Sequence, residues 1–337
     1  MRVFQIENDW GWDNLKVSSR PDPKPAAGQV LLRMKASAIN YRDLLVPERG
    51  YGSRTGPLPL IMLSDGVGEV VELGAGVTRL KVGERALPCF NQSWISGPVN
   101  AERLSRTLGG SMDGTMAEYM CLPQETVVKA PAYLSDLEAA SLPCAALTAW
   151  SAIVTYGSLG PGSKVLVQGT GGVALFAIQI AKLLGAHVTV ISSSDEKIAR
   201  AKALGADAAI NYKTTPEWYR ATRDITGGAG YDHIVELGGE KTLPQSLRCI
   251  RPGGTLSMIG VLSGGVMSAQ LGLVVTRHVR LQGITVGNRD GFEATLRAFE
   301  QHKVKPTIDR VFAFEELKEA MAYLKKGAHF GKVCIQH

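Results

Sequence analysis

The chain has 337 residues, of which 45% are hydrophobic, and a formal net charge of +6. This length suffices for two ordinary domains with separate cores. The Lys and Arg residues are dispersed, which argues against nucleic-acid binding as the main role. The five cysteines form no CxxC pair, the N-terminus MRVFQIENDW is too polar for a secretory signal, and polar residues interrupt every long apolar run. We therefore expect a cytoplasmic protein with reduced cysteines and no membrane span.

Residues 1–130 predict a β-rich domain. In QVLLRMKASAIN (29–40) apolar residues alternate with polar ones such as Arg33 and Lys35, which is the period of a half-buried strand. Frequent glycines in SDGVGEVVELGAGVTRLKVGERALP (64–88) separate further short strands. Short strands divided by glycine turns are typical of a small barrel or sandwich.

Residues 131–288 alternate between strands and helices. Ser135 stands three residues before Glu138, a capping box that opens a predicted helix over 135–154. Strands are predicted at 164–169, 187–192, 208–212, 231–239 and 253–261, with helices at 173–184 and 195–205. This βαβ order predicts a parallel doubly wound sheet. Residues 289–337 return to mixed elements, so the α/β domain is expected to be inserted into the first domain.

The stretch VLVQGTGGVA (165–174) places a glycine cluster between a strand and a helix, as the dinucleotide-binding fingerprint requires. Gly169 can make the turn, and Gly171 lets a pyrophosphate approach the backbone at the positive end of the helix. The expected cofactor-binding residues here are Gly169, Thr170, Gly171, Gly172 and Val173. The alternative is a tight turn with no ligand.

A carboxylate at the end of the second predicted strand of this domain would favour NAD, because it would bind the ribose diol. No carboxylate stands there. Ser192, Ser193 and Ser194 stand there instead, followed by Lys197. Hydroxyls and a cation suit the extra phosphate of NADP, so NADPH is the expected cofactor. The alternative is that the serines only cap the next helix. Tyr212 could contact the adenine or the same phosphate, or be an ordinary strand-end tyrosine.

Several segments, in their order along the chain, resemble the medium-chain dehydrogenase/reductases, especially the zinc-independent quinone-oxidoreductase-like branch. They are NYRD (40–43), DGVGEVVELGAGVTRLKVGERA (65–86), GTMAEY (114–119), AALTAW (145–150), VLVQGTGGVA (165–174), SSSDEKIARAKALGAD (192–207), GYDHIVE (230–236), GGTLSMIG (253–260) and GKVCI (331–335). The resemblance implies an α/β protein with a GroES-like β-rich catalytic domain (1–130 and 289–337). It also implies an inserted Rossmann doubly wound parallel sheet (131–288), with NADP(H) in the cleft between the two domains.

The zinc-dependent members of this family carry a cysteine, a His-Glu pair and a further cysteine or aspartate around the metal. Here Asn40 stands at the first position, Ser64 and Asp65 replace the pair, and only Cys144 matches a ligand. Residues 90–113 also lack the cysteines of the family's structural zinc lobe. Because catalytic zinc needs three protein ligands, we expect no bound metal. Asp65 is expected to pair with an arginine such as Arg42, with an acid role as the alternative.

The resemblance implies four catalytic positions, Asn40, Tyr41, Ser64 and Thr148. Asn40 would face the nicotinamide or the acceptor oxygen, and Tyr41 or Tyr51 could donate a hydrogen bond. Ser64 would lie beside the nicotinamide, and Thr148 would pack against its ring. The alternatives are a packing role for Tyr41 and a helix-interior role for Thr148.

The resemblance also implies further cofactor-binding positions. Gly260 and Val261 match the loop under the nicotinamide, while Thr285 and Val286 match the strand end that meets its carboxamide. Lys332 is expected near the cofactor, where it could contact a phosphate or be a surface lysine.

The function expected from this set is zinc-independent, NADPH-dependent hydride transfer to a quinone or an α,β-unsaturated carbonyl, since hydride chemistry belongs to the cofactor and the protein supplies polarity. One alternative is a zinc-dependent alcohol dehydrogenase with unusual ligands. The other is an NADPH-binding structural or sensor protein. The substrate is expected to be a small molecule, and the resemblance implies a homodimer formed through VRLQGITVGN (279–288).

Overall fold

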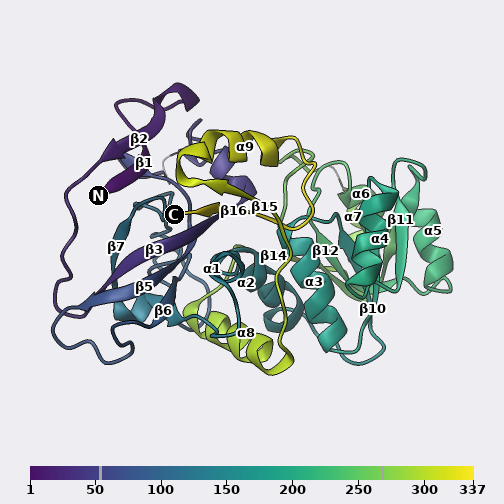
Figure 1. Cartoon of the computed structure of the whole chain (residues 1–337). Coiled ribbons are helices and arrows are strands. Elements are labelled where there is room, and N and C mark those ends of the chain that lie inside the picture. Colours follow the sequence, from purple (N-terminus) through teal and green to yellow (C-terminus); the bar gives the residue numbers. More distant parts are fainter. Residues whose placement is uncertain (53–54, 268) are drawn as a thin grey trace. The chain divides into compact units, whose positions relative to one another are not determined.

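The computed structural model describes residues 1–52, 55–267 and 269–337 (Figure 1). The chain forms two compact units, of which the first combines Met1–Leu147 with Gly287–His337 and the second comprises Thr148–Val286. The second unit is thus an insertion in the first. Its beginning differs from the expected residue 131, because helix α1 (Asp136–Ala140) packs on strands of the first unit.

The first unit contains a seven-stranded sheet in the order β15-β16-β3-β5-β6-β8, with β7 also paired to β3. Its strands are β3 (Gln29–Ile39), β5 (Asp65–Leu73), β6 (Arg85–Pro88), β7 (Tyr119–Pro123), β8 (Val127–Lys129), β15 (Ile308–Ala313) and β16 (Lys332–Gln336). A smaller sheet has the order β2-β1-β4, made of β1 (Arg2–Ile6), β2 (Leu15–Ser19) and β4 (Leu60–Ile61). The predicted GroES-like β-rich domain is confirmed.

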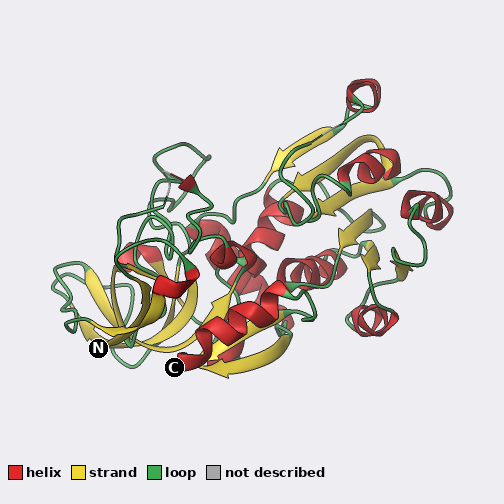
Figure 2. Cartoon of the chain, turned by 90° about the horizontal axis from the view of Figure 1, so that it is seen from above, coloured by secondary structure: helices red, strands yellow, loops and turns green. Residues whose placement is uncertain are grey.

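Residues 89–118 form turns, bends and isolated bridges that connect β6 to β7. Figure 2 shows long loops around the strands near the N-terminus. Besides α1, the helices of the first unit are α8 (Arg289–His302) and α9 (Leu317–Lys325). Short 3₁₀ turns are η1 (Trp12–Asn14), η2 (Tyr41–Leu44), η4 (Gln124–Thr126) and η6 (Phe314–Glu316).

The helix predicted over 135–154 is interrupted. The expected capping box is present, since Ser135 Oγ accepts the backbone N–H of Glu138 and the Glu138 carboxylate accepts that of Ser135 at 2.8 Å. However, α1 ends at Ala140, and α2 covers Ala145–Trp150, followed by a π-helical turn, η5 (Ser151–Thr155). Pro143 lies between α1 and α2, and it has no backbone N–H to continue a helix.

Strand β3 is the strand that connects the large sheet. It pairs antiparallel with β5, β7 and β16. The alternation expected for a half-buried strand holds only in the middle of β3, where Arg33 is exposed between buried Leu32 and Met34. It is lost toward the end, where even Ser37 is buried, because α1 and α9 both pack on this strand. The end of β3 is therefore covered.

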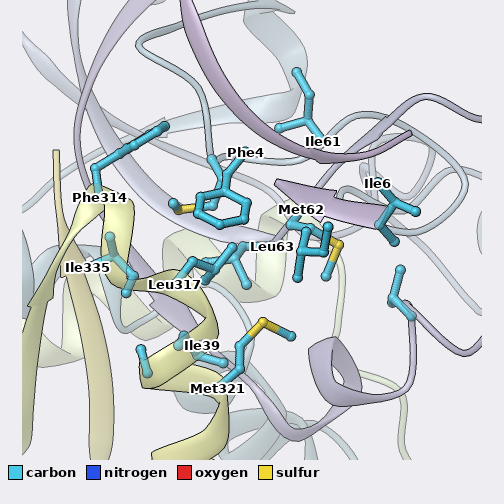
Figure 3. Packing of buried hydrophobic residues seen from close by; sticks show 14 of the residues in the cluster. Phe4, Ile6, Ile39, Ile61, Met62, Leu63, Phe314, Leu317, Met321 and Ile335 are labelled. Atoms are coloured by element: carbon cyan, nitrogen blue, oxygen red, sulfur yellow. The ribbon is translucent and has the colours of Figure 1, made fainter. Parts of the chain in front are cut away.

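A hydrophobic cluster of the first unit surrounds the end of β3 (Figure 3). Helix α9 contributes Leu317 and Met321, which lie close to Ile39 of β3 and Ile335 of β16. The cluster joins segments from both ends of the chain. It therefore fixes the position of β16 relative to β3.

The second unit is a six-stranded parallel sheet in the order β11-β10-β9-β12-β13-β14. Its strands are β9 (Lys164–Gln168), β10 (His187–Ser192), β11 (Ala208–Asn211), β12 (Tyr231–Glu236), β13 (Ile250–Met258) and β14 (Arg280–Gly283). Its helices are α3 (Gly172–Leu183), α4 (Asp195–Ala203), α5 (Trp218–Ile225), α6 (Leu243–Cys249) and α7 (Leu271–Thr276). The strand order reverses between β9 and β12, so the expected doubly wound Rossmann sheet is confirmed.

A search of the described residues finds no helix long and apolar enough to cross a membrane. The cysteines are all free.

His233 is a buried titratable group in the core strand β12. Its ring Nε2 lies 3.0 Å from Ser257 Oγ, and burial lowers the pKa of His233 to about 4. An unfolded histidine has a pKa near 6.5, so below that pH the unfolded state binds a proton that the folded state does not. The contribution of neutral His233 to stability is therefore present above about pH 6.5 and is lost as the pH falls toward 4.

We expect the wild type to lose roughly 3 kcal/mol more of its unfolding free energy than His233→Gln between pH 7 and 4. Urea denaturation at several pH values measures this difference. His302→Gln, on an exposed position of α8, is the matched control and should retain the wild-type pH dependence. Equal pH dependence of the wild type and His233→Gln would contradict the prediction.

Candidate functional site

The register of the large sheet brings three distant residues together. Strand β3 runs antiparallel to β5 and β16, so its end at Ile39 lies beside the beginnings of both strands. Strand β5 begins at Asp65 and β16 begins at Lys332, while Asn40 follows β3 directly. Backbone pairing alone therefore places an amide, a carboxylate and an ammonium group at one edge of the sheet.

Lys332 is a buried cation with only 3% of its surface exposed. Its Nζ donates to the backbone oxygen of Ile39 at 2.9 Å and to Asn40 Oδ1 at 2.6 Å. It also forms an ion pair with Asp65 Oδ2 at 3.6 Å. An ammonium group has three N–H donors, and three acceptors surround it here. Lys332 is therefore not a surface lysine, and its contacts here lie within the first unit.

Asp65 is fully buried and pairs with Lys332 instead of the expected Arg42. Arg42 Nη1 donates to the backbone oxygen of Leu108 at 2.8 Å and lies 3.8 Å from Asp43. Burial raises the pKa of Asp65, and the nearby Lys332 opposes that rise. The pairing follows from the strand register, which places the beginnings of β16 and β5 on either side of the end of β3.

Four side chains form a closed ring of polar contacts. Ser64 Oγ donates to Asp65 Oδ1 at 3.1 Å, and Asn40 Nδ2 lies 3.5 Å from Ser64 Oγ. The ring closes through Lys332, which contacts both Asn40 Oδ1 and Asp65 Oδ2. Each member thus fixes the orientation of the next.

Leu63 positions Ser64 through an unusual backbone conformation. Its φ is +66°, in the left-handed region that leucine rarely adopts. Gly109 and Gly114 pass so close that a Cβ on either would lie 2.3 Å or less from the Leu63 backbone oxygen. That oxygen accepts the N–H of Thr115 at 3.1 Å. The long loop therefore holds this strained turn in place directly before Ser64.

The segment after Asn40 forms the short turn η2. The carboxylate of Asp43 is buried and accepts the backbone N–H of Asn40 at 2.7 Å, and burial raises the pKa of Asp43 to about 6. Tyr41 is 44% exposed and Tyr51 is 38% exposed, with the Arg42 guanidinium 5.6 Å from the ring centroid of Tyr51. Asn40 is therefore held through its backbone and its side chain, while both tyrosines reach the surface.

The donor set at this edge does not fit a zinc ion. Cys144 donates its backbone N–H to Asp65 Oδ2 at 3.2 Å, and burial, with the charge of Asp65, raises the pKa of the Cys144 thiol to about 12. Zinc binds the thiolate. The charge of Asp65 is already balanced by Lys332, and Asn40 and Ser64 are weak ligands. No group of three or more His, Cys, Asp or Glu able to hold a metal was found among the described residues.

The glycine turn of the second unit connects β9 to α3. Gly169 has φ +78° and open space where a Cβ would stand. Gly171 is the residue before α3, and no side chain caps that helix end. Thr170 is buried and Val173 is half-buried. An open turn before an uncapped helix fits the pyrophosphate of a dinucleotide, because backbone N–H groups remain there for an anion.

A buried polar network beside this turn was missed by the sequence analysis. Gln168 at the end of β9 donates to Glu236 at 2.7 Å and to Ser246 at 2.9 Å, and accepts the backbone N–H of Gly238 at 3.0 Å. Glu236 at the end of β12 also accepts the hydroxyl of Thr242. The network joins the two strands between which the sheet order reverses. A polar residue ending each of two apolar strands was the signal that could have revealed it.

The serines after β10 have different environments. Ser192 is buried and Ser193 is half-buried. Ser194 caps α4, since its side chain accepts the backbone N–H of Lys197 at 3.4 Å. The capping alternative therefore describes Ser194, whose side chain is engaged by its own helix.

The carboxylate of Asp195 lies close to this strand end. It accepts the side-chain N–H of Asn211 at 2.9 Å. The backbone N–H of Tyr212 donates to the backbone oxygen of Ser192 at 3.0 Å, and the Tyr212 side chain is 41% exposed. Tyr212 thus follows β11 directly beside the end of β10.

The other candidate cofactor residues lie near the ends of β13 and β14. A Cβ at Gly260 would lie 1.9 Å from the backbone oxygen of Leu237, so only glycine fits there. Val261 and Thr285 are exposed, whereas Val286 is buried with φ +59°. These residues all belong to the second unit.

The described contacts bring together three of the candidate residues, Asn40, Ser64 and Lys332. Asp65, which was not among the candidate site residues, completes their ring. Its sequence signals were its position in the family's metal-ligand pair and a charge at the beginning of an apolar strand. Thr148 is buried in α2 and is the first residue of the second unit, so it does not join this ring.

Two family models match the chain. An alcohol dehydrogenase GroES-like domain matches residues 26–132, and a zinc-binding dehydrogenase domain matches residues 172–301. A zinc-type alcohol dehydrogenase-like protein of Schizosaccharomyces pombe is 41% identical over 335 residues, covering 97% of this chain and 96% of the relative. The solved structure of an alcohol dehydrogenase candidate from Sinorhizobium meliloti 1021 is 41% identical with a TM-score of 0.94, covering 100% and 98% of the two chains.

More distant relatives carry names for different reactions. The structure of an NAD-dependent alcohol dehydrogenase is 33% identical with a TM-score of 0.91 and covers all of both chains. An acryloyl-coenzyme A reductase of Sulfurisphaera tokodaii is 28% identical over 95% of this chain and 96% of the relative. The 2-octenoyl-CoA carboxylase reductase CinF, solved with NADP and 2-octenoyl-CoA, is 26% identical with a TM-score of 0.85, covering 96% and 82%.

The fold combines a GroES-like sheet with an inserted doubly wound sheet. Two domain models and relatives matched over nearly their full length agree with this fold. The chain belongs to the medium-chain dehydrogenase/reductase superfamily of oxidoreductases.

Proposed function

We propose that the protein is a zinc-independent, NADPH-dependent oxidoreductase that transfers a hydride to a quinone or an α,β-unsaturated carbonyl compound. The observation that carries the proposal is the ring of Lys332, Asn40, Ser64 and Asp65. It fills the positions at which the family resemblance implies metal ligands. A buried ammonium that neutralises Asp65 leaves neither the charge nor the donors for a second cation.

The acceptor class is supported by the donors at this site. When bound, NADPH supplies the hydride. Reduction of a conjugated carbonyl places negative charge on its oxygen, which needs hydrogen-bond donors. Asn40 has a carboxamide N–H group, and Tyr41 has an exposed hydroxyl-bearing ring. The acryloyl-coenzyme A reductase and the 2-octenoyl-CoA structure are named for conjugated thioesters, which belong to this acceptor class.

Other relatives are named alcohol dehydrogenases, which favours a second candidate, the zinc-dependent oxidation of an alcohol. The donor set weighs against it, because Asn40 and Ser64 are weak zinc ligands and the Lys332 ammonium lies 2.6 Å from Asn40 Oδ1. An NADPH-binding protein without enzymatic turnover is the third candidate.

NADPH specificity is supported by the end of β10. Ser192 and Ser193 provide hydroxyls, and Lys197 provides a cation in the first turn of α4. The neighbouring Asp195 is engaged by Asn211. Relatives differ in their cofactor, since the 2-octenoyl-CoA structure contains NADP and another relative is named NAD-dependent. We propose that the end of β10 determines which of the two cofactors this protein binds. The five free cysteines support a reducing compartment such as the cytoplasm.

We expect kcat/KM with NADPH to exceed that with NADH by at least about tenfold, or roughly 1.4 kcal/mol, on cyclic enones, enoyl thioesters or quinones. Steady-state absorbance of the reduced nicotinamide measures this ratio. Ser193→Ala with Lys197→Gln should lower the ratio, and Lys213→Gln, on an exposed lysine after β11, is the matched control.

Equal rates with both cofactors would overturn the specificity proposal and leave the reductase. Tight NADPH binding with no turnover on any acceptor would favour the non-enzymatic candidate.

Zinc independence predicts that Lys332 itself keeps a metal away. We expect purified wild type to contain no stoichiometric zinc. Asn40→Cys with Ser64→His adds two zinc donors near Cys144, and the further change Lys332→Met should tighten zinc binding by at least about tenfold, since it removes a positive charge in contact with residue 40. Competition with a chelating dye measures the two affinities.

Stoichiometric zinc in the wild type would revive the alcohol dehydrogenase candidate. Equal zinc affinity with and without Lys332 would show that its charge does not exclude the metal.

The second unit offers a surface for a homodimer, which we propose as the assembly. Strand β14 is the last strand of its sheet and has one neighbour, β13. Large apolar side chains are exposed on the neighbouring segment, namely Val261, Leu262, Val266, Met267, Leu271 and Val275. An open strand edge next to exposed apolar side chains is typical of an interface.

We expect light scattering to give twice the 36.1 kDa mass of one chain. Val275→Asp should shift the protein toward the monomer, because it buries a charge in the interface. Val82→Asp, at an equally exposed valine of the first unit, should not. A monomeric wild type, or an unchanged mass for Val275→Asp, would contradict this assembly.

A further inference from the structure

The carboxamide of Asn40 has two chemically opposite ends, and its neighbours determine which end faces where. An ammonium can donate hydrogen bonds but cannot accept them. The atom that lies 2.6 Å from Lys332 Nζ must therefore be the carbonyl oxygen Oδ1 of Asn40. The NH₂ end then faces away from Lys332, and one of its protons is directed at Ser64 Oγ at 3.5 Å.

Ser64 cannot reverse this arrangement. Its hydroxyl proton is given to Asp65 Oδ1 at 3.1 Å, so its lone pairs face Asn40. Asp65 in turn is fixed by Lys332 and by the backbone N–H of Cys144 at 3.2 Å. Each hydrogen bond of the ring therefore has a fixed donor and a fixed acceptor. Lys332 determines which is which, because an ammonium group can only donate. The Asn40 side chain also forms a hydrogen bond with the Asp65 carboxyl. Its contact with Ser64 at 3.5 Å is long, which leaves an N–H of the half-buried carboxamide able to meet a further acceptor.

We propose that Lys332 is a positioning residue for the reduction. Its ammonium orients the Asn40 carboxamide so that the N–H with the long contact to Ser64 is presented to the carbonyl oxygen of the substrate. This inference rests on the proposed reductase function and adds the residue that acts through Asn40.

Charge strengthens the effect of orientation. The Oδ1 of Asn40 accepts a hydrogen bond from a charged donor, which draws electron density away from the amide nitrogen and makes its N–H a stronger donor. A metal ion would polarise a substrate oxygen directly. Here the cation is covalently attached to the chain, and its polarising effect reaches the substrate through one amide group.

Lys332 is held firmly enough for this role. Its position is set by the pairing of β16 with β3, in which Val333 lies opposite Ile39. Its amine also donates to the Ile39 backbone oxygen at 2.9 Å, so backbone as well as side chains hold it. The side chain is buried, and burying an ammonium is stable only where acceptors surround it.

The decisive variant removes both charges together, because Lys332→Met alone would leave Asp65 buried without its partner. Lys332→Met with Asp65→Asn is neutral in the site, and Asp65→Asn alone, which keeps Lys332 next to Asn40, is the reference with which it is compared. Relative to that reference, we expect the double variant to lose at least about tenfold in kcat on a conjugated carbonyl acceptor. NADPH affinity, followed by nicotinamide fluorescence, should stay near the wild-type value.

A double-mutant cycle separates positioning from general structural support. Asn40→Ala should lower kcat to a similar extent, and adding Lys332→Met with Asp65→Asn to it should cause little further loss, since the orienting residue then has nothing to orient. The proposal would be overturned if the two losses of kcat multiplied when the changes are combined. It would also be overturned if Lys332→Met with Asp65→Asn kept the wild-type kcat.

A second readout does not depend on turnover. In protein labelled with ¹⁵N-asparagine, the side-chain N–H pair of Asn40 is assigned by its disappearance in Asn40→Ala. The pair should shift and broaden when Lys332→Met is added to Asp65→Asn. An unchanged pair in the double variant would overturn the orientation argument. A wild type that reduces no acceptor but shows the expected shift would instead reject the proposed function and keep the positioning by Lys332.

Discussion

A single buried positive charge constrains the first unit. The antiparallel register of β3 with β5 and β16 places the Lys332 side chain at a covered sheet edge, where water cannot solvate its ammonium. An ammonium buried without partners would cost far more than a typical domain can spare. The surrounding groups must therefore supply acceptors in fixed directions, and Asp65, Asn40 and a backbone oxygen do so. The orientation of Ser64 then follows from the chain of donors and acceptors.

This arrangement explains how a member of a family with many zinc enzymes can carry an organised polar site without suitable zinc donors. In a metal centre the cation is exchangeable, and several ligands from different elements converge on it. Here the same convergence of elements is organised by a side chain of the last strand. The strained Leu63 and the buried Asp43 support the two loops that meet at the ring, so the site is fixed by the fold even in the absence of a ligand.

The sequence predicted the architecture better than the site. Hydrophobic periodicity and glycine spacing were sufficient for β3, for β9 to β13 and for the turn before α3, because those signals are local. The predicted 135–154 helix was wrong in its continuity, since Pro143 was given too little weight. The partner of Asp65 could not be predicted, because Lys332 is far away in sequence and the register that joins them depends on packing by α9 and β16. Ser194 could be a phosphate donor or a cap from sequence alone, and the structure shows it capping α4.

The insertion of the second unit into the first has a consequence for biosynthesis. Asp65 and Asn40 leave the ribosome long before Lys332, and the whole second unit is made in between. Until β16 arrives, β3 has an open edge and Asp65 has no cation, so the nascent first unit is an incomplete sheet with an unpaired acidic group. The ring can close only after β16 has been synthesised. The polar site therefore forms late in folding, when β16 pairs with β3 and brings Lys332 to Asp65 and Asn40.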